Sequence, residues 1–194
     1  LGGLLRSEEI LLVFLRYPEP GKVKTRLIPA LGVAGAADAY RRMAERVVQT
    51  GETIDRPGFV TVAYVDPAER IGDVTSWLGL EMGTLGQPGG GLGERSIYGF
   101  SWAFERGASR VAAIGTDCIE LTAPVIEEAF ERLRKSDGVI GPALDGGYYL
   151  IGLSRPLPEV FRDIPWSSPR TAAVTLERFE ESGASVAFLP RLRD

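Results

Sequence analysis

Residues 10–15, Ile-Leu-Leu-Val-Phe-Leu, form an unbroken apolar run, and residues 16–26, Arg-Tyr-Pro-Glu-Pro-Gly-Lys-Val-Lys-Thr-Arg, follow it directly. An apolar run without alternation is typical of a parallel strand that is covered on both faces of its sheet. The prolines and the glycine that follow are residues of loops. The stretch therefore predicts a buried strand that ends in a stiff, positively charged loop.

Outward from this strand, further apolar runs alternate with segments that have the apolar spacing of helices. The predicted strands cover residues 10–15, 59–65, 80–85, 111–114, 139–140, 148–153 and 186–189. The predicted helices cover residues 35–50, a short segment after Pro67, and residues 94–106, 122–135 and 171–182, with Thr122 as the N-cap of the helix that it begins. This alternation predicts an α/β sandwich with a mostly parallel sheet. No repeat or long linker divides the 194 residues, so we expect one domain over residues 1–194.

The composition excludes several classes of site. The chain has no histidine and one cysteine, Cys118, which excludes a Ser-His-Asp triad, a His-ligated zinc site and an internal disulfide. Cys118 itself is expected to be a small buried residue of the core. A bound metal ion would depend on carboxylates, which favours Mg²⁺ or Mn²⁺.

The charge and hydropathy of the chain limit its partners. A net charge of -4 argues against a nucleic-acid partner, since such proteins usually present a strongly basic face. No segment approaches the roughly 20 apolar residues of a membrane span, and residues 10–15 lack the features of a secretory signal. We therefore expect a cytoplasmic protein, and the sequence leaves its oligomeric state open.

The loop after the first predicted strand is the first candidate site. In open α/β sheets, ligands bind beyond the carboxyl ends of the strands. This loop holds two of the three lysines of the chain, and cations on a stiff loop suit a diphosphate. The candidate phosphate-binding residues are Arg16, Gly21, Lys22, Lys24, Thr25 and Arg26. A solvated basic loop is the alternative, and the loop matches neither a Walker A motif nor a dinucleotide fingerprint.

Two aspartates also follow predicted strands. Asp117 comes just after residues 111–115, and one aspartate there can bind Mg²⁺ or Mn²⁺ together with phosphate oxygens and water. A helix cap or a turn is its alternative role, although Thr122 is available as the cap. Asp145 precedes two glycines after the strand at 139–140. It is a candidate second metal ligand or general base, or an ordinary residue of a hairpin turn.

A glycine-rich stretch over residues 86–93 leads into the helix predicted at 94–106. Gly93 and Glu94 lie at its start, where free backbone N–H groups can bind an anion. A plain flexible connection explains the same glycines equally well.

These segments together resemble a bacterial family of formerly unknown function (DUF2064-like), whose members are described as GT-A-type glycosyltransferases of the nucleotide-diphospho-sugar transferase superfamily. The stretches that carry the resemblance are residues 14–27, 91–95, 115–118, 141–153, 166–167 and 189–194. They span nearly the whole chain, and the first and fourth are specific.

The resemblance implies a GT-A fold, which is a Rossmann-like three-layer α/β/α sandwich. It implies that Asp117 is the metal-binding aspartate, that Asp145 is its partner carboxylate, and that residues 22–26 face the nucleotide phosphates. Two positions depart from the family pattern. Ile119 stands where a proline is usual, and Thr116-Asp117-Cys118 offers one carboxylate where many glycosyltransferases have Asp-x-Asp.

The function expected from this resemblance is that of a metal-dependent glycosyltransferase that uses a nucleotide-diphospho-sugar donor. A nucleotidyltransferase, which joins a nucleoside triphosphate to a phosphorylated acceptor and releases pyrophosphate, is the nearest alternative. A non-catalytic nucleotide-binding protein is the second. The sequence identifies neither the base nor the sugar nor the acceptor.

Overall fold

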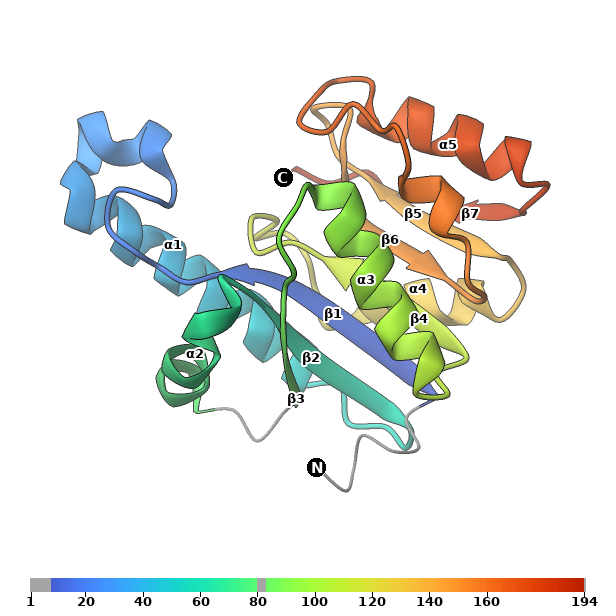
Figure 1. Cartoon of the computed structure of the whole chain (residues 1–194), viewed down its shortest axis with the longest axis horizontal. Helices are drawn as coiled ribbons and strands as arrows, with labels where there is room; N and C mark the ends of the chain where they lie inside the picture. The colour runs from blue at the N-terminus through green and yellow to red at the C-terminus, as the bar shows by residue number, and fades with distance from the viewer. Residues whose placement is uncertain (1–7, 80–82, 194) are drawn as a thin grey trace.

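The strands form one sheet of seven, as seen in the computed structural model, which describes residues 8–79 and 83–193 (Figure 1). Their order across the sheet is β3-β2-β1-β4-β6-β5-β7. The strands are β1 (Glu9–Arg16), β2 (Phe59–Asp66), β3 (Gly83–Gly86), β4 (Arg110–Ile114), β5 (Gly138–Pro142), β6 (Tyr148–Leu153) and β7 (Val186–Phe188). In the described residues, β6 runs antiparallel to its neighbours β4 and β5, and every other pairing is parallel. The predicted α/β fold with a mostly parallel sheet is confirmed.

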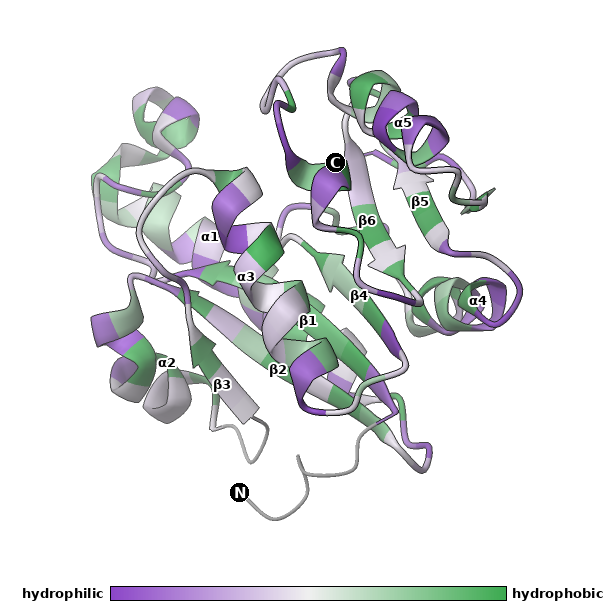
Figure 2. Cartoon of the chain, turned by 45° about the vertical axis from the view of Figure 1, so that its right-hand side comes forward, coloured by the Kyte–Doolittle hydropathy of each residue, from purple (hydrophilic) through white to green (hydrophobic). Residues whose placement is uncertain are grey.

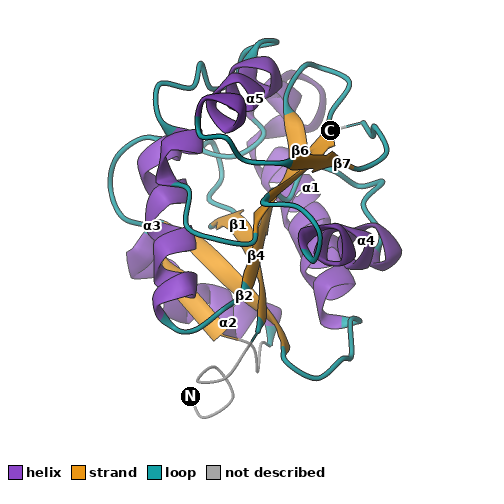
Figure 3. Ribbon diagram, turned by 90° about the vertical axis from the view of Figure 1, so that its right-hand side faces the viewer, coloured by secondary structure: helices purple, strands orange, loops and turns teal. Residues whose placement is uncertain are grey.

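Helices cover both faces of this sheet, which gives three layers (Figure 3). The helices are α1 (Ile28–Glu52), α2 (Ile71–Leu78), α3 (Leu92–Glu105), α4 (Ala123–Leu133) and α5 (Thr171–Glu181), with short 3₁₀ turns η2 (Thr25–Leu27), η3 (Ala68–Arg70) and η4 (Pro158–Phe161). Helices α1, α2 and α4 pack on one face, whereas α3, η4 and α5 pack on the other. In the part of the chain that the structure describes, no helix is both long and apolar enough to cross a membrane.

Strand β1 shows why its sequence is apolar without alternation. Leu11 and Val13 point into the core under α1 and α4, and Ile10 and Leu12 point into the core under α3. All four side chains are buried. Hydrophobic colour runs along β1, β2 and β4 in the middle of the molecule (Figure 2). Burial on both faces therefore selects apolar residues at successive positions.

Two predicted boundaries differ from the structure by more than two residues. The helix predicted at 35–50 begins at Ile28, because Pro29 fits its first turn and the positive φ of Gly32 (72°) joins two helical parts at a kink. The strand predicted at 80–85 is observed as β3 from Gly83, and residues 80–82 lie outside the described residues.

The predicted side-chain cap of α4 is wrong. Thr122 occupies the N-cap position, but its hydroxyl makes no capping hydrogen bond. Its backbone carbonyl instead accepts from the N–H groups of Val125 (3.1 Å) and Ile126 (3.2 Å). Pro124 in the first turn has no N–H, which leaves fewer donors for a cap to satisfy.

The segment between β1 and the kink forms an arm, defined here as residues 17–34. It contains the loop after β1, the turn η2 and the first part of α1. The arm projects beyond the carboxyl end of β1 (Figure 1). It therefore forms a wall above the sheet edge where ligands are expected.

Asp137 lies just before β5, and its contacts should make the free energy of unfolding depend on pH. Its Oδ1 accepts from Arg155 Nε (2.7 Å), and its Oδ2 accepts from the backbone N–H and the hydroxyl of Ser185 (2.9 Å each). The Arg155 hydrogen bond, followed by those of Ser185, lowers the pKa of Asp137 to about 2. A lowered pKa means that this contribution is present above about pH 4 and is lost as the pH falls toward 2.

We expect Asp137→Asn to lower the free energy of unfolding at pH 7, because the variant loses the charge that Arg155 and Ser185 stabilise. The loss should be only about 1 kcal/mol, because the carboxylate is partly exposed. Urea unfolding of both proteins from pH 7 to pH 2 checks this. The difference between them should shrink below pH 4, and a difference that stays constant to pH 2 contradicts the assignment.

Candidate active site

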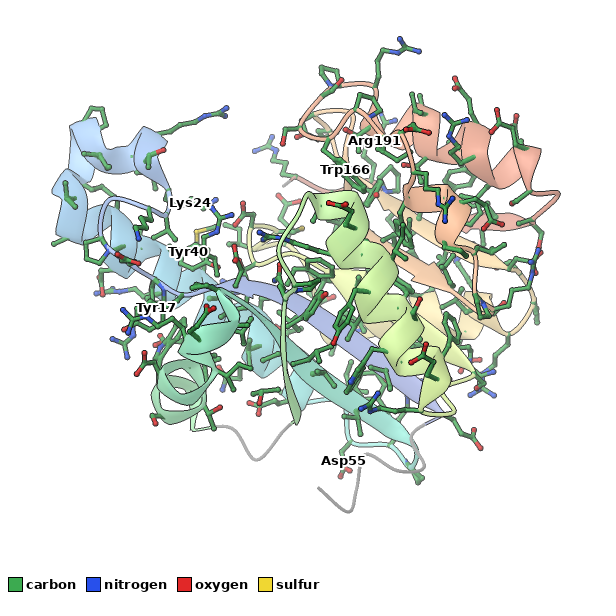
Figure 4. All side chains as sticks on the ribbon, viewed as in Figure 1. Tyr17, Lys24, Tyr40, Asp55, Trp166 and Arg191 are labelled. Carbon is green, nitrogen blue, oxygen red and sulfur yellow. The ribbon has the colours of Figure 1, made fainter. Side chains whose placement is uncertain are left out.

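A cleft of about 630 Å³ lies at the carboxyl ends of β1, β2 and β4, beneath the arm. Its size is that of a small-molecule site. The polar and charged residues that line it are Arg16, Lys22, Lys24, Thr25, Arg26, Tyr40, Asp66, Gln87, Arg95, Thr116, Asp117, Tyr148, Tyr149 and Ser167. Figure 4 shows Lys24 and Tyr40 where the arm meets the sheet, and Asp55 at the opposite end of the sheet.

The phosphate-binding residues predicted on the loop after β1 come together in this cleft, with one exception. Arg16, Lys22, Lys24, Thr25 and Arg26 all line it, whereas Gly21 does not. Gly21 has a positive φ (83°), so it acts as the turn that folds the arm back toward the sheet.

The arm also reaches Asp117. Lys24 Nζ lies 3.0 Å from Asp117 Oδ2, which joins the arm to the end of β4. Lys24 itself has the left-handed backbone conformation (φ 45°, ψ 42°) that side-chain-bearing residues rarely adopt. Asp117 is half exposed and caps no helix, because α4 begins after Thr122. The structure thus brings the predicted acidic and basic groups into one ion pair.

The buried side chain of Tyr40 links the carboxyl ends of β1 and β4 beneath the cleft. The Tyr40 hydroxyl accepts from the backbone N–H of Arg16 (2.8 Å) and shares a hydrogen bond with Thr116 Oγ1 (3.2 Å). Burial, the largest effect, raises the pKa of Tyr40, so it stays protonated. From α1, Tyr40 therefore holds the end of β1 and the residue before Asp117 in register.

A second charged group lies at the ends of β2 and β3, and the sequence analysis did not identify it. Asp66 Oδ2 forms an ion pair with Arg95 Nη1 (2.9 Å) and accepts a hydrogen bond from Arg16 Nε (3.2 Å). Arg95 Nη1 also reaches Gln87 Oε1 (3.2 Å), and Gln87 Nε2 donates to the carbonyl of Tyr64 (2.7 Å). Asp66 directly follows an apolar run. The criterion that identified Asp117, a charged residue just after a predicted strand, therefore applies to Asp66 as well. Gln87 follows the strand predicted at 80–85 in the same way, whereas Arg95 lies within the helix predicted at 94–106 and has no such signal.

Gly93 and Glu94 lie at the start of α3, outside the cleft wall. A Cβ at Gly93 would lie 2.5 Å from the carbonyl oxygen of Phe161, so this glycine is required by close packing. Glu94 Oε2 accepts from the N–H of Gly91 (2.8 Å), as in a capping box. Arg95 and Leu92 are the residues of this segment that line the cleft.

Asp145 also lies away from the cleft wall. It is exposed in the turn between β5 and β6, and its Oδ1 accepts from the N–H of Gly147 (2.9 Å). The next residue, Gly146, has a φ of 93° and packs against the backbone of Pro169. This is the hairpin-turn arrangement that the sequence left open, and the structure does not bring Asp145 together with Asp117 in the cleft.

The donor set of the cleft is compatible with a metal ion that arrives with phosphate. Residues 8–79 and 83–193 contain no group of three carboxylate, histidine or cysteine side chains that would form a metal site of protein ligands alone. Asp117 offers one half-exposed carboxylate beside several cations. Mg²⁺ is commonly held by one or two carboxylates, with substrate phosphates and water as its other ligands.

Comparisons with known proteins agree with this architecture. The family described as "Uncharacterized protein conserved in bacteria (DUF2064)" matches residues 42–168. A crystal structure of a candidate nucleotide-diphospho-sugar transferase from Desulfovibrio desulfuricans G20 is similar at a TM-score of 0.89 and 34% identity, over 97% of this chain and 82% of that chain. The expected Rossmann-like GT-A type of fold is thereby confirmed. No curated protein sequence gave a significant match.

More distant structures share the fold. CMP:2-keto-3-deoxy-manno-octonic acid synthetase in complex with CTP has a TM-score of 0.59 at 12% identity, over 95% of this chain and 90% of that chain. The 4-diphosphocytidyl-2C-methyl-D-erythritol synthase from Anaerococcus prevotii DSM 20548 has a TM-score of 0.59 at 9% identity, over 94% and 88%. At these identities the likeness extends to the fold alone.

Proposed function

We propose that this chain, which belongs to the DUF2064 family of proteins conserved in bacteria, is a glycosyltransferase that uses a nucleotide-diphospho-sugar donor together with Mg²⁺ or Mn²⁺. The observation that carries the proposal is the Lys24–Asp117 pair inside a cleft that four further cations line. A carboxylate for a metal ion and cations for phosphate oxygens therefore face the same space. The name of the 34% identical relative supports the same class of donor.

Different side chains of the cleft would bind different parts of such a donor. Lys22, Lys24 and Arg26 on the arm would offset the charge of the diphosphate. Asp117 would hold the metal ion, which when bound supplies positive charge to the leaving diphosphate. Tyr40 would keep the ends of β1 and β4 aligned beneath it. Once the bound donor has positioned these groups, they would stabilise developing charge without a large reorganisation.

The cleft continues past the phosphate region toward β6. Leu92, Ser167 and Tyr148, at the start of β6, also line the cleft. Tyr148 lies edge-on to Trp166, with ring centroids 6.3 Å apart. Apolar rings beside a hydroxyl suit a sugar or an acceptor rather than a phosphate. We propose this end for the sugar and the acceptor.

A thermal-shift panel tests the proposed donor class. Nucleoside diphosphates and nucleotide sugars are each tested with and without Mn²⁺, and each should raise the unfolding temperature more with Mn²⁺ than without it. At a ligand concentration of about 100 Kd the stabilisation is about 2.7 kcal/mol. For a chain of this length that corresponds to a shift of roughly 5–10 °C. A panel in which no nucleotide shifts the unfolding temperature contradicts the proposal.

A nucleotidyltransferase is the second candidate, because the cations of the arm suit a triphosphate as well as a diphosphate. The distant structures with CTP or a cytidyl product in their names have the same fold. The released product separates the two reactions. Nucleoside diphosphate release supports sugar transfer, pyrophosphate release supports nucleotidyl transfer, and turnover of either kind excludes a purely binding role.

A further inference from the structure

We infer that Lys24 acts as a resident counter-ion at Asp117, so that a divalent cation binds there tightly only together with the diphosphate that draws Lys24 away. The inference rests on the proposed function, since it concerns how the same cleft loads its metal ion and its nucleotide. The carboxylate of Asp117 has two possible cationic partners, which are Lys24 and a divalent metal ion. In the structure, Lys24 Nζ lies 3.0 Å from Asp117 Oδ2.

The backbone conformation of the arm positions the side chain of Lys24 next to Asp117. Lys24 adopts the left-handed conformation, which is strained for a residue other than glycine. The turn is held by hydrogen bonds from Lys22 N to Glu19 O (3.0 Å) and from Leu27 N to Lys24 O (2.8 Å). Strain of this kind persists where the surrounding structure requires it, often at ligand sites. Here it places the ammonium group on Asp117.

Burial distinguishes Lys24 from the other lysine of the loop. The side chain of Lys24 is 25% exposed, whereas that of Lys22 is 69% exposed. Lys22 Nζ pairs with Glu19 Oε1 at 2.9 Å, within its own loop. Lys22 therefore lines the same cleft without neutralising Asp117, and it serves as a matched control.

The charges explain why metal and diphosphate should enter together. A free divalent cation meets a carboxylate that an ammonium group already neutralises, and the described residues offer it no cluster of further acidic ligands. A diphosphate changes both conditions, because its oxygens attract Lys24 and also complete the coordination of the metal. Lys24 would then pass from Asp117 to the phosphate, and Asp117 would pass from Lys24 to the metal.

The first experiment measures Mn²⁺ alone, by electron paramagnetic resonance of the free ion titrated with the full chain. The wild type should bind Mn²⁺ weakly, and Lys24→Met should bind it about ten-fold more tightly because one neighbouring positive charge is gone. Lys22→Met should stay within about two-fold of the wild type. The gain should vanish in Lys24→Met combined with Asp117→Asn. An unchanged affinity in Lys24→Met, or a gain that survives in the double variant, overturns the inference.

The second experiment adds inorganic pyrophosphate as the probe for the diphosphate. In the presence of Mn²⁺, Lys24→Met should bind pyrophosphate about ten-fold more weakly than the wild type, opposite in sign to its effect on Mn²⁺ alone. Lys24→Arg keeps the charge and should restore both affinities to near wild type. Thermal unfolding of each variant shows whether it is folded. Failure to bind pyrophosphate or any nucleotide would contradict the proposed function, whereas the Mn²⁺ titration alone decides the role of Lys24.

Discussion

Asp117→Asn is expected to lower turnover of the nucleotide-sugar donor about 100-fold or more. The change keeps the size of the side chain and removes the charge that would hold the metal ion. Loss of groups that only support metal ligands costs about 10–100-fold, so loss of the ligand itself should cost at least as much. Initial rates with saturating Mn²⁺, measured as release of the nucleoside diphosphate, give the number.

The fold should survive this substitution. Asp117 makes one ion pair and its side chain is 49% exposed, so the free energy of unfolding should change by less than about 1 kcal/mol. Asp55→Asn is the matched control, because Asp55 is an exposed aspartate at the opposite end of the sheet (Figure 4). If Asp117→Asn turns over donor as fast as Asp55→Asn, the assignment of Asp117 to the site is wrong.

The same variant separates a metal role from a phosphate role. Asp117→Asn releases Lys24 from its ion pair and removes a negative charge from the cleft. Binding of nucleotide without metal should therefore be no weaker than in the wild type, and only the increment caused by Mn²⁺ should disappear. Equal losses with and without Mn²⁺ would indicate that the variant damages the cleft in general.

The sequence predicts Asp145 as a second metal ligand or general base because it follows a predicted strand, and the family resemblance implies a partner carboxylate at the same position. The structure places it in an exposed turn, where it binds the N–H of Gly147. From this position, Asp145→Asn should reduce turnover by less than about ten-fold. A loss as large as that of Asp117→Asn would show that the turn between β5 and β6 moves into the cleft when substrate binds.

The sequence predicted the parts of the site that follow directly from strand ends. Asp117 and the basic loop were identified because a continuous apolar run marks where a parallel strand stops, and ligands bind at that edge. Asp66 obeys the same rule after β2. No second feature accompanies Asp66 in the sequence, so it was not among the predicted site residues. Position at a strand end is therefore informative even for a single charged residue.

Other features depend on contacts between distant segments. The left-handed conformation of Lys24 has no local sequence signal, since glycine or asparagine is the usual residue there. Tyr40 fits the apolar stripe of a helix, and only its hydrogen bonds to Arg16 and Thr116 show that it reaches the cleft. The glycines before α3 suited a phosphate-binding loop. At Gly93, however, the packing against Phe161 explains the glycine.

Glu9→Ala should cause a large loss of stability at a position away from the cleft. Glu9 opens β1 at the amino edge of the sheet, and its side chain is 6% exposed. Three arginines from separate segments surround its carboxylate. Arg56 Nη2 contacts Oε2, while Arg110 Nε (2.8 Å) and Arg134 Nη2 (3.6 Å) approach Oε1. One buried acid thus joins the loop before β2, the start of β4 and the segment after α4.

Removing this acid leaves Arg56 and Arg110 largely buried without their shared counter-charge. Breaking a buried ion pair from one side costs about 3–5 kcal/mol, and partial exposure of the arginines favours the lower end, about 3 kcal/mol. For a chain of this length the unfolding temperature should fall by roughly 6–12 °C. Urea unfolding at pH 7 measures the free energy directly.

The neighbouring residue provides the control for this prediction. Glu8 is 76% exposed and lies 3.9 Å from Arg110, so Glu8→Ala should cost less than about 1 kcal/mol. Glu9→Gln keeps the shape and a hydrogen-bond acceptor, and should fall between the two because it loses only the charge. The loss in the free energy of unfolding should increase in the order Glu8→Ala, Glu9→Gln, Glu9→Ala. This order tests the effects of burial and of charge separately. If Glu9→Ala costs no more than Glu8→Ala, the arginines are satisfied by water, and the carboxylate does not hold this edge of the sheet together.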